Sequence, residues 1–213
     1  MIEKLLEPII DSFTTGKYYK EIYQAKKEYF DKTGPVYEDD IEFDQRMSIF
    51  MDWYLFDRDL PEFDLPPIKH FFKINKNDFS EKTRLIYNDL CQTQHSIFRL
   101  KRKTWNKNGV VIQDLFSGLT LTVMIPDINR GFYRGDIFEA RVIKYLDSYC
   151  FSKGFCFHPT DVSPFILDEI KKVRNQDKKK QLKLILQLSG MKLKHLRFQH
   201  IDITHIYQMN SKF

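Results

Sequence analysis

The sequence predicts an α+β fold, with N-terminal helices packed on a small antiparallel β meander or barrel and followed by a C-terminal helix. Apolar residues recur at helical spacing at first, alternate from Ser96, and return to helical spacing after Ser163. With 213 residues, 42% of them hydrophobic, the chain is long enough to bury a sizeable core. We expect a helical, aromatic-rich subdomain at 1–95, a β unit at 96–160, and a basic C-terminal helix and tail at 161–213.

The first part of the chain carries the signals of several helices. One apolar helix face ends at Gly16, and a tyrosine-rich face ends at Gly34. A third helix is expected at about 43–56. Ser80 followed by Glu81 is typical of another helix start, because a serine side chain can cap the first free backbone N–H groups.

The spacing of apolar residues changes from helical to alternating at Ser96, which predicts strands. The Asn108-Gly109 dipeptide favours a tight hairpin turn after the first strand. Further strands are expected at 110–115, 119–125, 136–145 and 148–157. A last helix is expected from Ser163 to Ser189, with Gly190 as its C-cap; residues 191–209 fit a strand or a helix.

Charge divides the chain into two unlike parts. Residues 1–98 carry 13 Lys and Arg against 19 Asp and Glu, a balance of −6. Residues 99–213 carry 21 against 10, a balance of +11. Such segregation bears on partners more than on fold. It suggests that the second part meets nucleic acid, an acidic protein face or a membrane surface.

Basic residues near one tryptophan are the strongest binding candidates. Phosphate contacts and base stacking are what single-stranded nucleic acid requires of a protein surface. The candidates for nucleic acid or another anionic partner are Arg99, Lys101, Arg102, Lys103, Trp105, Arg130, Arg134, Lys178, Lys179 and Lys180. A solvated surface neutralised by the acidic part of the same protein explains these residues equally well.

Two acidic and basic motifs are expected to be structural. In the first, Asp52, Trp53, Asp57 and Arg58, we expect Asp57 to cap a turn, Arg58 to pair with a carboxylate and Trp53 to fill the core. The alternative is a Mg²⁺ or Ca²⁺ site in the acidic segment 52–64.

The second motif contains Asp136 and Arg141, with Glu139 between them. It fits a hairpin turn followed by an outward-facing charged side of a strand. The alternative is a carboxylate-containing nuclease site spread along the chain.

Two stretches around these motifs resemble a group of uncharacterised bacterial proteins. They are FMDWYLFDR at 50–58, followed by Leu60-Pro61, and IQDLFSG at 112–118, followed by RGDIFEARV at 134–142. Members of the group combine a helical DWF-x-FDR element with a small β unit ending in a GD-x-x-x-AR strand, and some related chains carry metal-binding SEC-C tails. Such a cysteine-rich tail is absent here. The resemblance implies a bacterial cytosolic protein and carries no activity that can be transferred.

Several function classes lack their sequence signals. The chain has no nucleophile elbow, phosphate-binding glycine loop or CxxC pair, and we expect no metal and no cofactor. Its three cysteines are expected to be reduced. The short apolar runs and the absence of a signal-peptide pattern at the start predict no membrane span and a cytoplasmic location.

The leading interpretation is a non-enzymatic binding or adaptor protein that acts through a protein partner. The alternative is a nucleic-acid-binding protein that uses the basic face of the β unit. A metal-dependent hydrolase is the second alternative. The sequence leaves the oligomeric state open.

Overall fold

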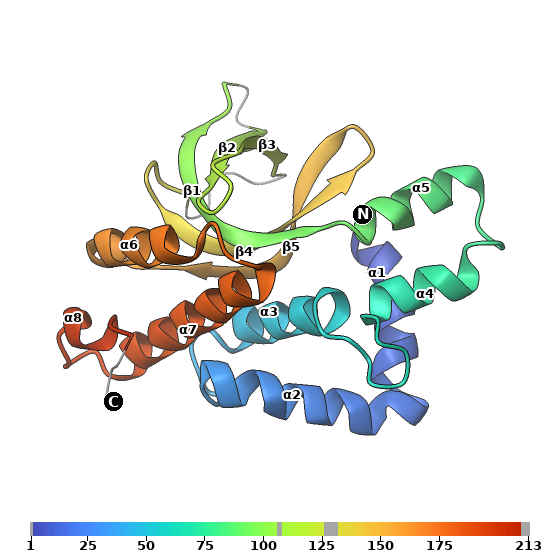
Figure 1. Cartoon of the computed structure of the whole chain (residues 1–213), viewed down its shortest axis with the longest axis horizontal. Coiled ribbons are helices and arrows are strands. Elements are labelled where there is room, and N and C mark those ends of the chain that lie inside the picture. Colours follow the sequence, from blue (N-terminus) through green and yellow to red (C-terminus); the bar gives the residue numbers. More distant parts are fainter. Residues whose placement is uncertain (1, 106–107, 126–131, 210–213) are drawn as a thin grey trace.

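A computed structural model of the chain describes residues 2–105, 108–125 and 132–209, and in it a small β-barrel is seated on a set of helices (Figure 1). The helices before the barrel are α1 (Ile2–Thr14), the short 3-10 helix η1 (Gly16–Tyr18), α2 (Tyr19–Thr33), α3 (Phe43–Phe56), α4 (Pro67–Asn75) and α5 (Glu81–Leu90). Those after it are η2 (Thr160–Val162), α6 (Ser163–Val173), α7 (Lys178–Arg197) and α8 (Ile203–Ile206). The predicted α+β class is confirmed.

The barrel contains five strands. They are β1 (Gln94–Lys103), β2 (Gly109–Asp114), β3 (Thr120–Met124), β4 (Ile137–Tyr145) and β5 (Ser148–Phe157). The strands close in the order β1-β2-β3-β5-β4, with β4 pairing back to β1. All pairs are antiparallel except β3–β5, which is parallel at Val123–Tyr149. The sheet is therefore a closed barrel with a crossover and not a simple meander.

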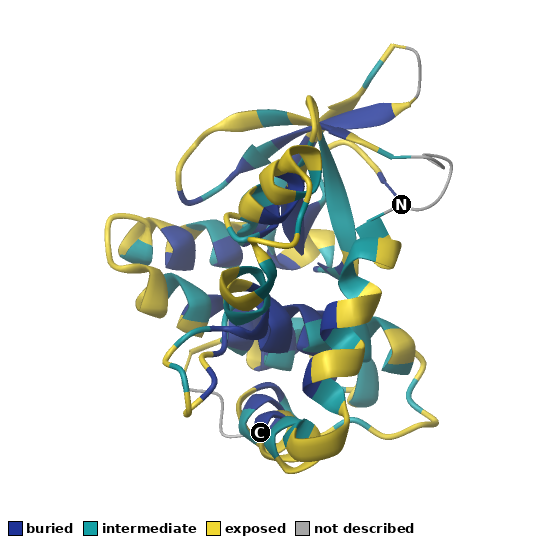
Figure 2. Ribbon diagram, turned by 90° about the vertical axis from the view of Figure 1, so that its right-hand side faces the viewer, coloured by how far each residue is buried: buried dark blue, intermediate teal, exposed yellow. Residues whose placement is uncertain are grey.

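Successive side chains of β1 point to opposite sides of the strand and pack into two different hydrophobic cores. Phe98 and Leu100 point into the barrel, which is filled by apolar side chains of all five strands. Ile97 points the other way and packs with Ile166 and Leu188 of α6 and α7. A third, aromatic-rich core surrounds α3 in the helical layer. Figure 2 shows buried residues along the inner helices and the strands, and exposed residues on the outer turns.

A glycine permits α3 and β5 to pack closely. A Cβ atom added at Gly154 of β5 would lie 2.6 Å from Asp52 Oδ2 and 3.0 Å from Ile49 Cα of α3. Both distances are shorter than a normal contact, so any larger residue would push helix and barrel apart. This contact holds the end of α3, where the first acidic motif begins, against the barrel.

The single helix predicted at 163–189 is wrong in two respects. It divides into α6 and α7 because Asp177 starts a new helix, its carboxylate accepting from Lys180 N at 2.9 Å. Gly190 lies inside α7 and not at its end. A Cβ there would stand 3.3 Å from Thr33 O, so this glycine allows α7 to cross the end of α2 closely. Within the described residues, no helix is both long and apolar enough to cross a membrane.

Candidate functional site

Three of the predicted basic residues share the outer side of β1. Phe98 and Leu100 point into the barrel, so Arg99 between them points outward. A bulge between Leu100 and Arg102 resets the alternation, and Arg102 pairs with Val111, whose neighbours on both sides face the interior. Lys101 Nζ reaches the outward-facing Gln113 Oε1 at 3.4 Å. We call Arg99, Lys101, Arg102 and Arg134 the basic face.

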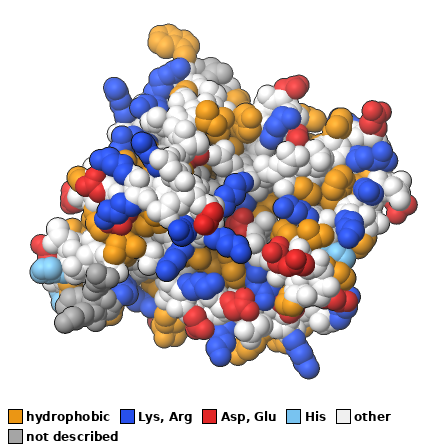
Figure 3. Space-filling view, viewed as in Figure 1, with side chains coloured by type: hydrophobic (Ala, Val, Ile, Leu, Met, Phe, Trp, Pro, Cys, Tyr) orange, Lys and Arg blue, Asp and Glu red, His pale blue; other side chains and the backbone are white. Residues whose placement is uncertain are grey.

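Arg134 joins this face through the backbone beside the bulge. Gly135 N donates to Leu100 O at 2.9 Å, which places the exposed Arg134 next to Lys101. Arg99, Arg102 and Arg134 have no ion pair or hydrogen bond from their side chains to another described residue. Figure 3 shows blue side chains gathered over the upper part of β1, near the tip of the β1–β2 hairpin.

Two exposed aromatic residues flank the basic face. Trp105 follows β1 at the hairpin tip and is 100% exposed. Tyr133 precedes Arg134 and is 73% exposed. A fully exposed tryptophan contributes nothing to the core, and its ring is free to stack on a ligand.

The other predicted basic residues lie elsewhere. Lys103 pairs with Val110, an inward-facing residue, so it projects from the opposite side of β1 at the open end of the barrel. Lys178, Lys179 and Lys180 begin α7, separate from the basic face. Arg130 falls outside the described residues. The predicted set therefore divides into one group on the barrel and another on the helical layer.

The residues of the first acidic motif are engaged in contacts within the protein. Asp52 accepts from Ser152 Oγ at 2.5 Å, and burial raises its pKa. Trp53 lies in the aromatic core of the helical layer. Arg58 pairs with Glu21 at 2.6 Å and Glu28 at 2.7 Å, which ties α3 to α2.

Asp57 belongs to a buried network that the sequence did not predict. Its Oδ2 atom faces His95 Nδ1 at 3.2 Å and also accepts from Arg141, while His95 Nε2 lies 2.8 Å from Glu139. We call Asp57, His95, Glu139 and Arg141 the buried charge network. Glu139 and Arg141 lie on the outward side of β4, as expected, but they are 1% and 2% exposed, so the expected solvent exposure of this charged side is wrong. Asp136 accepts from Tyr133 N at 2.6 Å, in the turn before β4.

The network sets the protonation of its members. Burial disfavours a charge on His95, but its hydrogen bonds to Asp57 and Glu139 outweigh burial and raise its pKa to about 9. Burial would raise the pKa of Asp57, yet the charge of Arg141 and the hydrogen bond with His95 lower it to about 2. At neutral pH His95 is therefore protonated and Asp57 is ionised.

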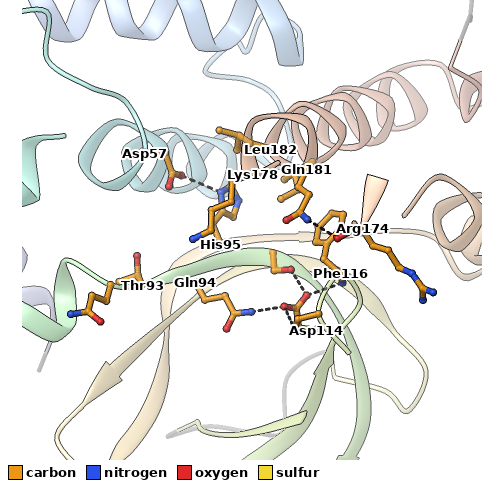
Figure 4. Close-up of a pocket in the computed structure, with 14 residues that line it drawn as sticks. Asp57, Thr93, Gln94, His95, Asp114, Phe116, Arg174, Lys178, Gln181 and Leu182 are labelled. Carbon is orange, nitrogen blue, oxygen red and sulfur yellow. Dashed lines mark hydrogen bonds and ion pairs between the residues drawn. The ribbon is translucent and has the colours of Figure 1, made fainter. Parts of the chain in front are cut away.

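Beside this network a polar pocket of about 470 Å³ opens between the barrel and the corner of α6 and α7 (Figure 4). Its barrel wall holds Gln94, His95, Ser96, Asp114 and Ser117. Its helical wall is formed by Arg174, Lys178, Gln181, Leu182 and Ile185, and Asp57 lies at the inner end. Lys178 is the one predicted binding residue in this lining.

Asp114 organises the barrel wall of the pocket. One carboxylate oxygen accepts from Ser96 Oγ at 2.6 Å and Phe116 N at 3.0 Å. The other accepts from Ser117 Oγ at 2.7 Å and from Gln94 Nε2. These bonds join the start of β1 to the β2–β3 turn. Asp114 therefore supports the wall and leaves little capacity for a ligand.

Sequence reasoning did not predict the roles of His95 and Asp114, and it placed Glu139 on a solvent-facing side of a strand. His95 and Asp57 are 38 residues apart, and His95 and Glu139 are 44 apart, so no local spacing reveals them. One signal was present: Asp114 followed by Ser117-Gly118 is typical of a turn with side-chain hydrogen bonds to the backbone.

Acidic residues proposed as alternative metal ligands do not converge. Asp52 bonds to Ser152, Asp57 belongs to the buried charge network, and Asp136 bonds within its own turn. Across residues 2–105, 108–125 and 132–209, no group of three or more His, Cys, Asp or Glu side chains is arranged to hold a metal ion.

Fold and site define an α+β protein with a closed five-stranded barrel, an exposed basic face and a polar pocket between barrel and helices. The chain belongs to a family of unknown function (DUF7986), whose model matches residues 2–184. Membership of an uncharacterised family is confirmed, while the relation to SEC-C proteins stays a prediction. No curated protein and no solved structure matches the chain.

Proposed function

We propose that this protein binds single-stranded nucleic acid on the basic face of its β-barrel. The observation that carries the proposal is the exposure of Lys101, Arg102 and Arg134 around one bulge, with Trp105 fully exposed at the adjoining hairpin tip. Guanidinium and ammonium groups contact phosphates, and an exposed indole stacks on bases of any sequence.

The surface between the basic residues suits an extended strand. Outward positions of β2 and β3 carry Gln113, Thr120 and Thr122, which offer amide and hydroxyl groups without negative charge. Gln113 lies directly beside Arg99 in the sheet register, and Thr120 and Thr122 lie on the next strand, opposite Gln113 and Val111. Polar, uncharged side chains next to cations leave the attraction for phosphates unopposed.

Barrel topology supports the same function by analogy. Closed five-stranded barrels with the order β1-β2-β3-β5-β4 and a parallel β3–β5 pair have the arrangement of the OB-fold. OB-folds bind oligonucleotides or oligosaccharides on the face of strands 2 and 3 and on the flanking loops. Fold analogy alone does not establish function, so the argument rests first on the basic face.

A binding or adaptor role through a protein partner remains the second proposal. The basic start of α7, with Lys179 and Lys180 exposed, would suit an acidic protein surface. Purification from native extract, with and without nuclease, separates the two. Nucleic acid that leaves at higher salt supports the first proposal, and one stoichiometric protein companion supports the second.

The direct test is fluorescence anisotropy with labelled single-stranded RNA and DNA of about twelve nucleotides. We expect binding that weakens as salt is raised, with a slope of about −0.7 for each phosphate contacted. The double variant Lys101→Glu/Arg102→Glu should lose at least tenfold in affinity, because two attractive charges become repulsive.

The matched control is Lys26→Glu/Lys27→Glu, which makes the same change in net charge on the exposed side of α2. Figure 1 shows α2 at the end of the molecule opposite the barrel. Affinity of this control should stay within about twofold of the original protein. Binding that is independent of salt, or equally reduced in both variants, would contradict the proposal.

A further inference from the structure

The polar pocket beside Asp57 holds charged and polar groups that have no partner among the described residues. Lys178 and Arg174 have no hydrogen bond or ion pair from their side chains to another described residue. In Figure 4, Lys178 reaches from the start of α7 across the pocket toward β1, and Arg174 extends outward at the pocket edge. Both residues are exposed, and they place one cation over the pocket and a second at its mouth.

The pocket also contains oxygen atoms that can accept hydrogen bonds from a ligand. Asp57 Oδ2 is taken up by His95 and Arg141, but no described residue donates to its Oδ1 atom. Gln94 and Gln181 each use their amide nitrogen within the protein, which leaves their Oε1 atoms available. These three oxygens accept hydrogen bonds from hydroxyl or amino groups.

The charge balance around the pocket is positive. His95, Arg141, Arg174 and Lys178 are four cations, and Asp57, Asp114 and Glu139 are three carboxylates. His95 and Arg141 are held within the buried charge network, and the excess charge therefore resides on the unpaired Lys178 and Arg174. An anionic group at the mouth would complete this balance.

We infer that the pocket binds a phosphate ester that also carries hydroxyl or amino groups, of the size of a nucleoside monophosphate. The phosphate lies between Lys178 and Arg174, and the hydroxyl or amino groups donate to Asp57 Oδ1 and the two glutamine oxygens. Phe116, Leu182 and Ile185 supply the apolar part of the lining. The volume of about 470 Å³ lies within the range of small-molecule sites.

The same chemistry has two sources, a free nucleotide and the phosphorylated end of a bound strand. The end of β2 and the β2–β3 turn connect the pocket and the basic face, since Ser117 of the turn lines the pocket and Gln113 of β2 contacts Lys101. A strand on the basic face would therefore have a short path to the pocket. Binding of the free nucleotide goes beyond the proposed function and does not depend on it.

The test is isothermal titration calorimetry of the full chain with each of the four ribonucleoside 5′-monophosphates, and with adenosine and inorganic phosphate. We expect at least one monophosphate to bind, and adenosine to bind at least tenfold more weakly than AMP if AMP is that ligand. Lys178→Gln should reduce the affinity at least tenfold and Arg174→Gln severalfold. Neither side chain has a partner in the described structure, so both variants should keep the original melting temperature.

Lys179→Gln is the matched control, because Lys179 is the exposed neighbour of Lys178 and does not line the pocket. Oligonucleotides of one sequence with a 5′-phosphate or a 5′-hydroxyl form the second arm. Preference for the 5′-phosphate that Lys178→Gln abolishes assigns the pocket to strand ends and supports the inference, as does binding of the free nucleotide alone.

Three results would overturn the inference. The first is no heat from any monophosphate together with no preference for the 5′-phosphate. The second is an equal loss in Lys178→Gln and Lys179→Gln. The third is nucleotide binding that Lys101→Glu/Arg102→Glu removes and Lys178→Gln leaves intact. That last result would leave the proposed nucleic-acid function standing, so failures of the two proposals are distinguishable.

Discussion

The buried charge network and the basic face use the same kinds of side chain on neighbouring strands, with opposite surroundings. Arg141 of β4 is 2% exposed and meets Asp57, Thr93 and the ring of Phe56, whose centroid lies 4.7 Å from its guanidinium carbon. Arg102 of β1 is exposed and has no side-chain partner among the described residues. The difference lies in where each strand side faces, toward the helices or toward solvent.

This difference gives a criterion for telling charged residues that stabilise the fold from charged residues that can bind a ligand. A buried ion is tolerated only when other groups replace its hydration, so the partners of Arg141 are required by folding. An exposed cation keeps its hydration and contributes little to folding. Charges of the second kind are free to meet a ligand.

The largest effect is expected from breaking the buried charge network. Arg141→Met should lower the free energy of unfolding by about 3–5 kcal/mol, because it leaves the Asp57 carboxylate buried without its strongest partner. Urea unfolding followed by circular dichroism measures the change. Lys144→Met, at the exposed end of the same strand, is the control, and its pair with Asp89 should contribute less than about 1 kcal/mol. Equal losses of stability in Arg141→Met and Lys144→Met would contradict the distinction between buried and exposed charges.

The next effect concerns pH. The folded pKa of His95 is about 9, above its ordinary value of 6.5, so the stability due to His95 protonation is fully present below pH 6.5. It is lost as pH rises through 9 and amounts to at most about 3 kcal/mol. His95→Gln should remove this dependence. Unfolding free energies of both proteins between pH 6 and 10 test the prediction, and parallel curves would contradict it.

Low pH should also destabilise the protein through the buried charge network, in this case by protonating Asp57. Asp57 has a folded pKa of about 2, below its ordinary value of 3.8, so its contribution is present above pH 3.8 and is lost as pH falls through 2. Asp57→Asn should be destabilised at neutral pH and should lose less stability than the original protein between pH 5 and 2. Unfolding curves over that range provide the measurement. A loss of the same size in both proteins would count against this role.

A smaller effect, on binding alone, is expected at the hairpin tip. Trp105→Ala should weaken the binding of single-stranded nucleic acid by about 1–3 kcal/mol, because base stacking on the indole ring is lost. Because Trp105 is fully exposed, the melting temperature of the variant should equal that of the original protein. Anisotropy and thermal unfolding of the same preparation test both statements. Unaltered affinity would remove Trp105 from the proposed site.

The smallest effect is expected on the free energy of unfolding when a residue of the basic face is replaced. Arg102→Gln should change the free energy of unfolding by less than about 0.5 kcal/mol, since its side chain has no partner to lose. Urea unfolding provides the measurement. A loss of several kcal/mol would show that the face is structural, and the comparison with Arg141 would then fail.

Local patterns determined most of the elements. Alternation located all five strands, and helical spacing located the helix at 43–56 and the start at Ser163. The break at Asp177 was missed because an N-cap residue inside a basic, helix-forming stretch resembles one continuous helix. A glycine after an apolar helical run predicts a helix end, but Gly190 lies within α7 because α2 approaches it closely there.

The sequence by itself determined that Arg99, Lys101 and Trp105 form a cationic and aromatic set, since they are close together on β1 and just after its end. Only the tertiary structure decided that Arg141 and Glu139 are buried, and that Asp57 and His95 meet them. Alternation tells which residues share a side of a strand, but not whether a helix covers that side. Packing of the helices against the barrel makes that decision, because it removes water from the outer side of β4 and from Ile97 on the outer side of β1, and leaves Lys101 and Arg102 near the end of β1 in solvent.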